Sequence, residues 1–176
     1  MKFAFLLIIA STFLFSCTSH SSNITREEVL TAQKAWGKGI VEIGKVYQNK
    51  GNYQARAAKH IKDLYAYEQE DEVLFKPTLA SDDQFRESFD EALSYFVKGK
   101  IKEDKGFAIK PWSKVRFGNQ QITIDTDSAI AMGNYFFTPV GSTNEVKVEY
   151  TFAYIKDKDG KLRINVHHSS LPFSKK

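Results

Sequence analysis

Cysteine is almost absent from this chain of 176 residues, which contains a single one, Cys17. No disulfide can therefore form within the chain, and we expect the folded domain to depend on its hydrophobic core alone. A large excess of one charge is also lacking, because 25 basic residues accompany 21 acidic ones and the two signs are interspersed. This balance is not typical of nucleic-acid-binding proteins, so we expect no nucleic-acid partner.

The sequence also lacks the motifs of several enzyme classes. It contains no glycine-rich phosphate loop, no Gly-x-Ser-x-Gly elbow and no paired-carboxylate motif. His167 and His168 are adjacent, and adjacent side chains on a strand point to opposite faces, so they cannot chelate one ion together. The other histidines are His20, in an N-terminal tether, and His60, on a predicted helix. We therefore expect neither a metal nor a cofactor.

Long hydrophobic runs are limited to the N-terminus. Lys2 precedes thirteen uncharged residues, Phe3 to Phe15, whereas a membrane-spanning helix needs about 20. A run of this length is typical of a signal peptide. We interpret residues 1–16 as the signal peptide, residues 17–24 as a lipidated cysteine with its tether, and residues 25–176 as one domain.

The end of this run, Leu14-Phe15-Ser16-Cys17, resembles a bacterial lipobox, the motif that directs lipid attachment to its cysteine. The alternative is an ordinary secretory signal in which Cys17 is incidental. In both cases we expect an exported protein. It would be a lipoprotein at the periplasmic face of a bacterial membrane, held there by its lipid anchor alone, or a periplasmic or secreted protein.

Three amphipathic helices are predicted in the first half of the domain. A capping box formed by Thr25 and Glu28 begins the first helix, and Tyr53–Tyr67 forms the second. We expect Ser81 to cap the third helix. The apolar stripe of that helix consists of Phe85, Phe89, Leu93 and Phe96.

Strands dominate the remainder. Glu72–Thr78 is a short strand that Pro77 confines to an edge, because proline cannot donate to a β-ladder. The further strands are predicted at Ala108–Phe117, Gln120–Asp125 and Ser128–Thr138 and in a hairpin within Val146–Phe173. Helices followed by antiparallel strands predict an α+β fold in which three N-terminal helices pack on a curved antiparallel sheet.

The strand Ser128–Thr138 is apolar on both faces, because Ala129, Ala131 and Tyr135 alternate with Ile130, Met132 and Phe136. A sheet with two apolar faces needs two covers. The helices supply one cover, and a second copy of the chain is the simplest source of the other. We therefore expect a homo-oligomer, a dimer or larger, through the sheet face. The alternative is a closed cone filled by its own side chains.

Three short motifs resemble those of a known family. Phe75 and Pro77 match a Phe-Glu-Pro motif, Asp159-Gly160-Lys161 matches a turn, and His167–Pro172 matches His-Arg-Ser-Gly-Ala-Pro. On these motifs the chain, over Arg26–Phe173, resembles the cone-shaped, cystatin-like domains of the nuclear-transport-factor-2-like (SnoaL-like) superfamily. Within that superfamily it is most similar to the association (hub) domain of calcium/calmodulin-dependent protein kinase II.

The resemblance implies an assembly role and a small cavity that can hold a carboxylate. The hub arginines that line this pocket match Ala153 and His168, so Lys76 would supply the permanent positive charge. Strict alternation along the last strand places His168 inside the cone. Binding should then tighten as the pH falls through about 6.5, because an imidazole attracts an anion only when protonated. The residues expected around a small anionic ligand are Lys76, Thr78, Tyr150, His167, His168 and Ser169.

Two functions follow from these observations. The first, which we favour, is an exported, oligomerising domain that binds a small molecule such as a carboxylate without demonstrated catalysis. The second is an isomerase or dehydratase of the cone fold that uses His168 with Tyr150 or Tyr154 as its hydrogen-bond partner. No inward Asp or Glu is evident from the strand pattern, so the base-and-donor pair of such enzymes is incomplete.

Overall fold

The computed structural model describes residues 23–68 and 73–174. The predicted signal peptide, the lipobox with Cys17 and nearly all of the tether lie outside these residues. The elements are α1 (Arg26–Gln48), α2 (Tyr53–Leu64), β1 (Leu74–Lys76), α3 (Phe89–Val97), the 3-10 helix η1 (Phe107–Ile109), β2 (Trp112–Ile124), β3 (Ser128–Pro139), β4 (Val146–Lys156) and β5 (Leu162–Ser170). The predicted α+β class and the order of helices before the strand meander are confirmed.

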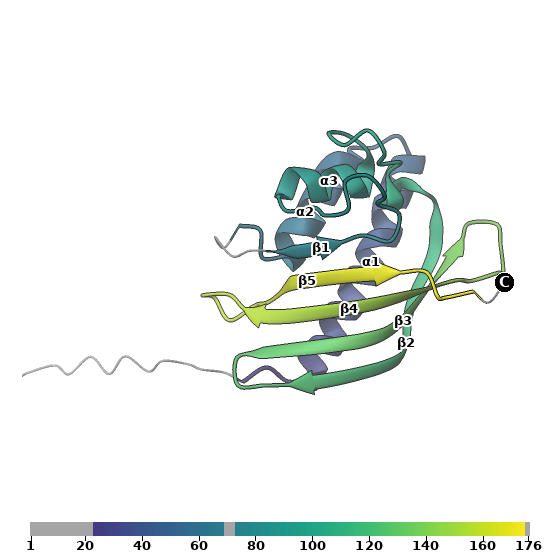
Figure 1. Cartoon of the computed structure of the whole chain (residues 1–176). Helices are drawn as coiled ribbons and strands as arrows, with labels where there is room; N and C mark the ends of the chain where they lie inside the picture. Colours follow the sequence, from purple (N-terminus) through teal and green to yellow (C-terminus); the bar gives the residue numbers. More distant parts are fainter. Residues whose placement is uncertain (1–22, 69–72, 175–176) are drawn as a thin grey trace, which may run out of the picture.

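The five strands form one curved sheet in the order β1-β5-β4-β3-β2 (Figure 1). β1 lies at the edge, as Pro77 predicts, but it runs parallel to β5, so the sheet is mixed and not wholly antiparallel. The two strands predicted between residues 108 and 125 are one long strand, β2, which pairs with β3.

A bulge in β2 explains why one strand reads as two in the sequence. The register between β2 and β3 shifts between Gly118 and Gln121, and Asn119 has a φ of 53°. An added residue of this kind bends a strand and increases its twist. A side chain on Gly133 would place its Cβ 2.9 Å from the Cα of Gln120, so glycine is needed where β3 passes under the bulge.

The helices cover the concave face of the sheet, with α1 crossing behind the strands and α2 and α3 beside β1 (Figure 1). The capping box predicted at the start of α1 is present, because the Glu28 amide donates to Thr25 Oγ1 and the Thr25 amide donates to Glu28. Trp36 lies at the centre of the core and is 1% exposed. Its indole packs against rings from α2, η1 and all of the long strands, so helices and sheet share one core.

The third helix begins later than predicted. α3 starts at Phe89 and is capped by Ser88 with Glu91, whereas the segment from Ser81 to Glu87 is not helical. The backbone amides of residues 81–83 donate to the carboxylate of Glu103, which comes from the loop after α3. Those amides therefore bind a side chain in place of continuing a helix, and Phe85 is exposed outside the apolar stripe.

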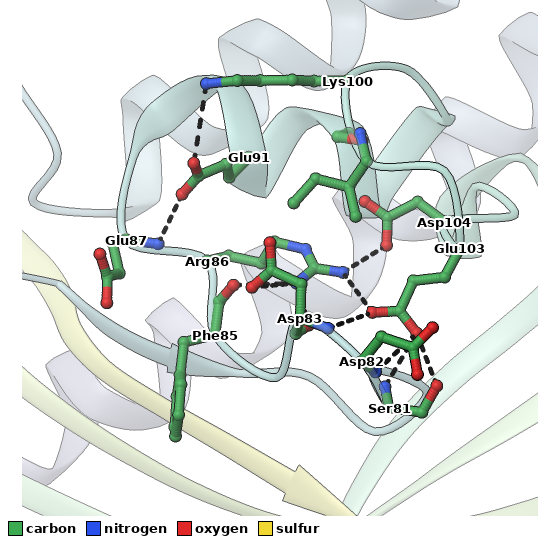
Figure 2. A network of polar contacts seen from close by, with 12 residues as sticks. Ser81, Asp82, Asp83, Phe85, Arg86, Glu87, Glu91, Lys100, Glu103 and Asp104 are labelled. Carbon is green, nitrogen blue, oxygen red and sulfur yellow. Dashed lines mark hydrogen bonds and ion pairs between the residues drawn. The ribbon is translucent and has the colours of Figure 1, made fainter.

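A buried arginine completes this joint between two loops (Figure 2). The Arg86 side chain is fully buried, and it donates to Asp104 Oδ1 at 2.6 Å and to the backbone carbonyls of Asp83 and Phe85. Its guanidinium also lies 3.8 Å from Glu103. The loop before α3 and the loop after it are thus held together by one cation and two carboxylates.

The outer face of the sheet exposes apolar side chains, as the sequence predicts. Ile130 and Met132 on β3 are 51% and 57% exposed, whereas Ala129, Ala131 and Tyr135 are buried against the helices. Pairing of two copies through this face stays a prediction. Within the described residues, no helix combines the length and the apolarity that crossing a membrane would require.

We expect Arg86→Met to destabilise the protein by about 3–5 kcal/mol, because it leaves Asp104 buried without a counter-ion. Asp104→Asn in the same chain should recover part of this loss by removing the stranded charge. Lys59→Met is the control, since the exposed Lys59–Asp63 pair is worth less than about 1 kcal/mol. Urea unfolding measures all three variants, and equal losses for Arg86→Met and Lys59→Met would contradict the prediction.

Candidate functional site

A cavity of about 610 Å³ opens between the helices and the concave face of the sheet. Its walls come from α1, α3, the two loops joined by Arg86, η1 and the ends of β2 to β5 nearest these loops. Most of the lining is aromatic or aliphatic. The hydroxyl-bearing, charged and histidine side chains that line it are Tyr47, Thr78, Tyr95, Glu103, Asp104, Lys105, Lys110, Tyr135, His167 and Ser169.

Four hydroxyl groups meet in this cavity, and we call them the hydroxyl cluster: Thr78, Tyr95, Tyr135 and Ser169. The Thr78 and Ser169 hydroxyls are 2.7 Å apart, and either oxygen can be the donor. The Ser169 and Thr78 side chains act on Tyr135 by lowering its pKa against the effect of burial, and the Leu79 backbone and the Thr78 side chain act on Tyr95 in the same way. β1, α3, β3 and β5 each bring a hydroxyl to or near this point, and no single stretch of sequence contains it.

His167 lines the same cavity and is held by a chain of two hydrogen bonds. Trp36 Nε1 donates to the Tyr65 hydroxyl at 2.9 Å, and that hydroxyl lies 2.8 Å from His167 Nδ1. Because the Tyr65 oxygen accepts a hydrogen bond from the indole N–H, the hydroxyl's own O–H is free to donate to Nδ1. This assigns the remaining ring proton to Nε2. Nε2 is buried and has no hydrogen-bond partner within the protein.

Burial determines the charge state of these groups. Desolvation, with minor contributions from His168 and His60, holds the pKa of His167 well below its usual range, so the imidazole is neutral. Desolvation also raises the pKa of Tyr95 to about 12 and raises the pKa of Tyr135 further. The site therefore presents neutral hydrogen-bond donors at physiological pH.

A β-bulge explains why His167, and not His168, faces the cavity. On β5, Ile164 pairs with Tyr154 and Val166 pairs with Ala153, so Asn165 is an extra residue with no partner on β4. This insertion reverses the alternation that Leu162 and Ile164 begin. His167 is consequently buried opposite Phe152 and stacked on Phe75, whereas His168 is exposed. The expectation that His168 enters the cone is wrong.

The structure separates the six expected ligand-binding residues into two groups. Thr78, His167 and Ser169 line the cavity. Lys76 and His168 are neighbours in the parallel pairing of β1 and β5, and their shared face is the opposite one. Tyr150 is buried beside Gln33, whose Nε2 donates to its hydroxyl at 3.1 Å, and it does not line the cavity. Lys76 and His168 are therefore not part of this cavity.

Sequence reasoning missed Tyr95, Tyr135 and Trp36 as cavity residues. Tyr135 is correctly predicted on the inward face of its strand, and Trp36 on the buried face of α1, but both read as ordinary core. Tyr95 lies beside the predicted stripe of the third helix. The available signal was the polar atom that each of these aromatic side chains has to pair when buried.

Among the residues that the structure describes, no group of three or more His, Cys, Asp or Glu side chains is placed to hold a metal ion. The two lining carboxylates are engaged elsewhere. Asp104 binds Arg86, and hydrogen bonds from the Ser81 hydroxyl and from backbone amides lower the pKa of Glu103 to about 2.

The arrangement of helices on a curved sheet defines the class of protein. An NTF2-like protein with a cystatin-like fold from Novosphingobium aromaticivorans is 10% identical, with a TM-score of 0.55 over 85% of this chain and 83% of that one. At this identity the likeness shows the fold alone. The predicted cone-shaped, NTF2-like fold is thereby confirmed. The specific relationship to the kinase association domain is not shown.

Closer relatives define the family. Residues 27–171 match the family described as metal-independent carbonic anhydrase, and the chain belongs to this family. A metal-independent carbonic anhydrase from Nostoc sp. is 46% identical over 155 residues, which cover 85% of this chain and 75% of that protein. A crystal structure of the iota-carbonic anhydrase from a cyanobacterium, complexed with bicarbonate, is 44% identical, with a TM-score of 0.82 over 87% of this chain and 95% of that one.

This membership corrects the function expected from the sequence. The family is one of enzymes, so the preference for a domain without catalysis is overturned. The comparisons equally give no support to an association domain or a lipoprotein. The expectation of a small anionic ligand agrees with the bicarbonate complex of the cyanobacterial relative.

We expect Tyr65→Phe to change the protonation pattern of His167, because it removes the hydroxyl that binds Nδ1. It also leaves the buried Trp36 N–H unpaired, at a cost of about 1–3 kcal/mol in stability. Nitrogen-15 NMR of the histidine ring should show a single Nε2–H tautomer in the wild type and a mixture in the variant. Tyr67→Phe, which removes a hydroxyl bonded to the Arg86 carbonyl, is the control. An unchanged His167 spectrum in Tyr65→Phe would contradict the assignment.

Proposed function

We propose that this protein interconverts carbon dioxide and bicarbonate without a metal ion. The observation that carries the proposal is the 44%-identical bicarbonate-bound relative, which shares nearly the whole fold. The hydroxyl cluster supports it from this chain alone, because it gathers several neutral donors at one point of a largely apolar cavity.

Bicarbonate fits this donor set chemically. It is a small planar anion whose oxygens each accept hydrogen bonds. Thr78, Ser169 and the tyrosine hydroxyls can donate to it, and the His167 side chain lines the same cavity. Hydrogen bonds to a charged partner contribute about 1.5–3 kcal/mol each, so a few such donors can replace a cation.

The reaction also needs a place for carbon dioxide, and the apolar walls of the cavity provide it. Carbon dioxide carries no charge, and Trp36 and Phe137 offer it a dry surface. When the oxygen of a water molecule bonds to the carbon, one C=O π bond breaks and its electrons move to an oxygen. Donors placed beforehand at that oxygen stabilise the developing charge more than they stabilise carbon dioxide itself.

The proton that the water loses needs a path out of the cavity. Because either the Thr78 or the Ser169 hydroxyl can donate to the other, the pair can pass a proton by exchanging roles. Tyr95, on whose pKa the Thr78 side chain acts, can extend this chain. The high pKa values of the tyrosines keep them as donors, so the proton is delivered to solvent and not stored on the protein.

We expect Ser169→Ala and Thr78→Val each to lower the rate of carbon dioxide hydration by about ten- to a hundredfold, as the loss of one donor to a developing oxyanion does. Stopped-flow hydration with a pH indicator, on protein freed of metal by chelation, measures it. Ser170→Ala is the matched control, because the Ser170 hydroxyl binds Glu149. Full activity in both cavity variants would contradict the proposed site.

We further propose that two copies associate through the outer face of the sheet, which the exposed Ile130 and Met132 support. A charged side chain in that contact would be costly to bury, so Met132→Glu should halve the mass measured by light scattering. Lys158→Glu, exposed in the turn after β4 and away from this face, tests the effect of charge alone. A wild-type protein that is already monomeric would remove the proposal.

A further inference from the structure

The cavity is much larger than the ligand of the proposed reaction. Bicarbonate has four non-hydrogen atoms, and at the roughly 30 Å³ that a water molecule occupies it would need about 120 Å³ at most. The cavity measures about 610 Å³. By the same measure about ten or more further non-hydrogen atoms can be accommodated beside a bound bicarbonate.

The remaining volume is apolar and reaches the surface. Phe107, Trp112 and Val148 line the apolar part of the cavity, and Val148 pairs with Tyr135 across β3 and β4. Its rim carries Leu79 and Leu171, which are 64% and 56% exposed. Exposed aliphatic side chains around an apolar cavity mark a surface that gains free energy when a ligand covers it.

The charges that line the cavity favour an anion. Both carboxylates are occupied, Asp104 by Arg86 and Glu103 by the hydroxyl and amides of the preceding loop. Lys105 and Lys110 are exposed among the lining residues, with the Lys110 ammonium 5.4 Å from the centre of the Trp112 ring. Two ammonium groups at an apolar opening attract anions and disfavour cations.

From these observations we propose that the cavity binds a second class of ligand, monocarboxylates with an aryl or alkyl tail. A carboxylate has the same planar O–C–O unit as bicarbonate, with a carbon chain in place of the hydroxyl. Its oxygens take the donors of the hydroxyl cluster, and its tail fills the apolar volume as far as Leu79 and Leu171. The inference rests on the proposed function only for the place of the carboxylate, and such ligands would compete with bicarbonate.

Binding is measured directly with three probes: 3-phenylpropionate, acetate and the uncharged 3-phenylpropan-1-ol. Trp36 and Trp112, the two tryptophans of the chain, both line the cavity, so quenching of their fluorescence reports occupancy, and titration calorimetry provides the dissociation constants. We expect 3-phenylpropionate to bind at least tenfold more tightly than acetate, because burying a phenyl group supplies that factor. It should also bind at least tenfold more tightly than the alcohol, because the carboxylate forms charge-assisted hydrogen bonds.

Variants separate the two ends of the cavity. Val146 lines the cavity opposite Phe137 and not Tyr135, so Val146→Phe narrows the apolar part and should weaken 3-phenylpropionate at least tenfold while acetate binds as before. Val140→Phe makes the same change on an exposed residue outside the cavity and is the matched control. Leu79 is exposed at the rim, so Leu79→Ser should leave the fold intact and weaken the binding of 3-phenylpropionate severalfold. Ser169→Ala should weaken both carboxylates by similar factors.

The outcomes keep this proposal apart from the proposed function. If 3-phenylpropionate binds no more tightly than acetate, or no more tightly than the alcohol, the proposal is overturned even when the protein hydrates carbon dioxide. If 3-phenylpropionate binds as expected but no hydration is measured, the proposed function fails and this inference stands. Where both hold, 3-phenylpropionate should raise the KM for bicarbonate and leave kcat unchanged.

Discussion

The rest of the structure depends on two linked hydrogen bonds. They connect the buried indole of Trp36 to the Tyr65 hydroxyl, and that hydroxyl to His167. Each of these three groups would cost about 1–3 kcal/mol if buried without a partner. In sequence they are 29 and 102 residues apart, and they join α1, the end of α2 and β5. The same two bonds orient the imidazole in the cavity and fix its tautomer. Folding the core and building the site are therefore one event, and neither can be altered without the other.

A second constraint, the extra residue Asn165 in β5, shows where sequence reasoning succeeds and where it ends. Alternation predicts the inward face of β4 correctly, because that strand is regular and Tyr150, Phe152 and Tyr154 are all buried. The same rule fails on β5 two residues after Ile164. The residues of β5 that follow Val166 are all polar, so the hydrophobic pattern does not show on which side of the strand they continue. The choice between His167 and His168 thus depended on a pairing register that only the partner strand sets.

The other errors have a common origin in contacts between distant segments. Ser81, followed by Asp82 and Asp83, is a good local start for a helix, and the acceptor that takes those backbone amides is Glu103, about twenty residues later. The local preference for a helix is overridden by a tertiary contact with a carboxylate that is distant in the sequence. The hydroxyl cluster could not be predicted for the same reason, since a threonine, a serine and two tyrosines are unremarkable until α3, β3 and β5 meet at the end of β1. The capping box at Thr25 and the edge position of β1, which depend on residues close in sequence, are confirmed.

The charge state of the cavity connects these constraints to catalysis. Arg86, a fully buried cation close to the cavity, is neutralised by Asp104 and held by backbone carbonyls, so it braces the two loops and is not free to hold an anion. The donors at the hydroxyl cluster are neutral, and the two lysines of the lining, Lys105 and Lys110, are exposed. Neutral donors hold a ground-state anion less tightly than a buried ammonium or guanidinium would, and product release is correspondingly faster. The hydrogen bonds from these donors still become stronger as charge develops on an oxygen of the ligand. The cavity contains little water, so each hydrogen bond acts through a low dielectric constant. The proposed reaction between an uncharged gas and a small anion needs this combination, and burial and hydrogen bonding supply it in this cavity.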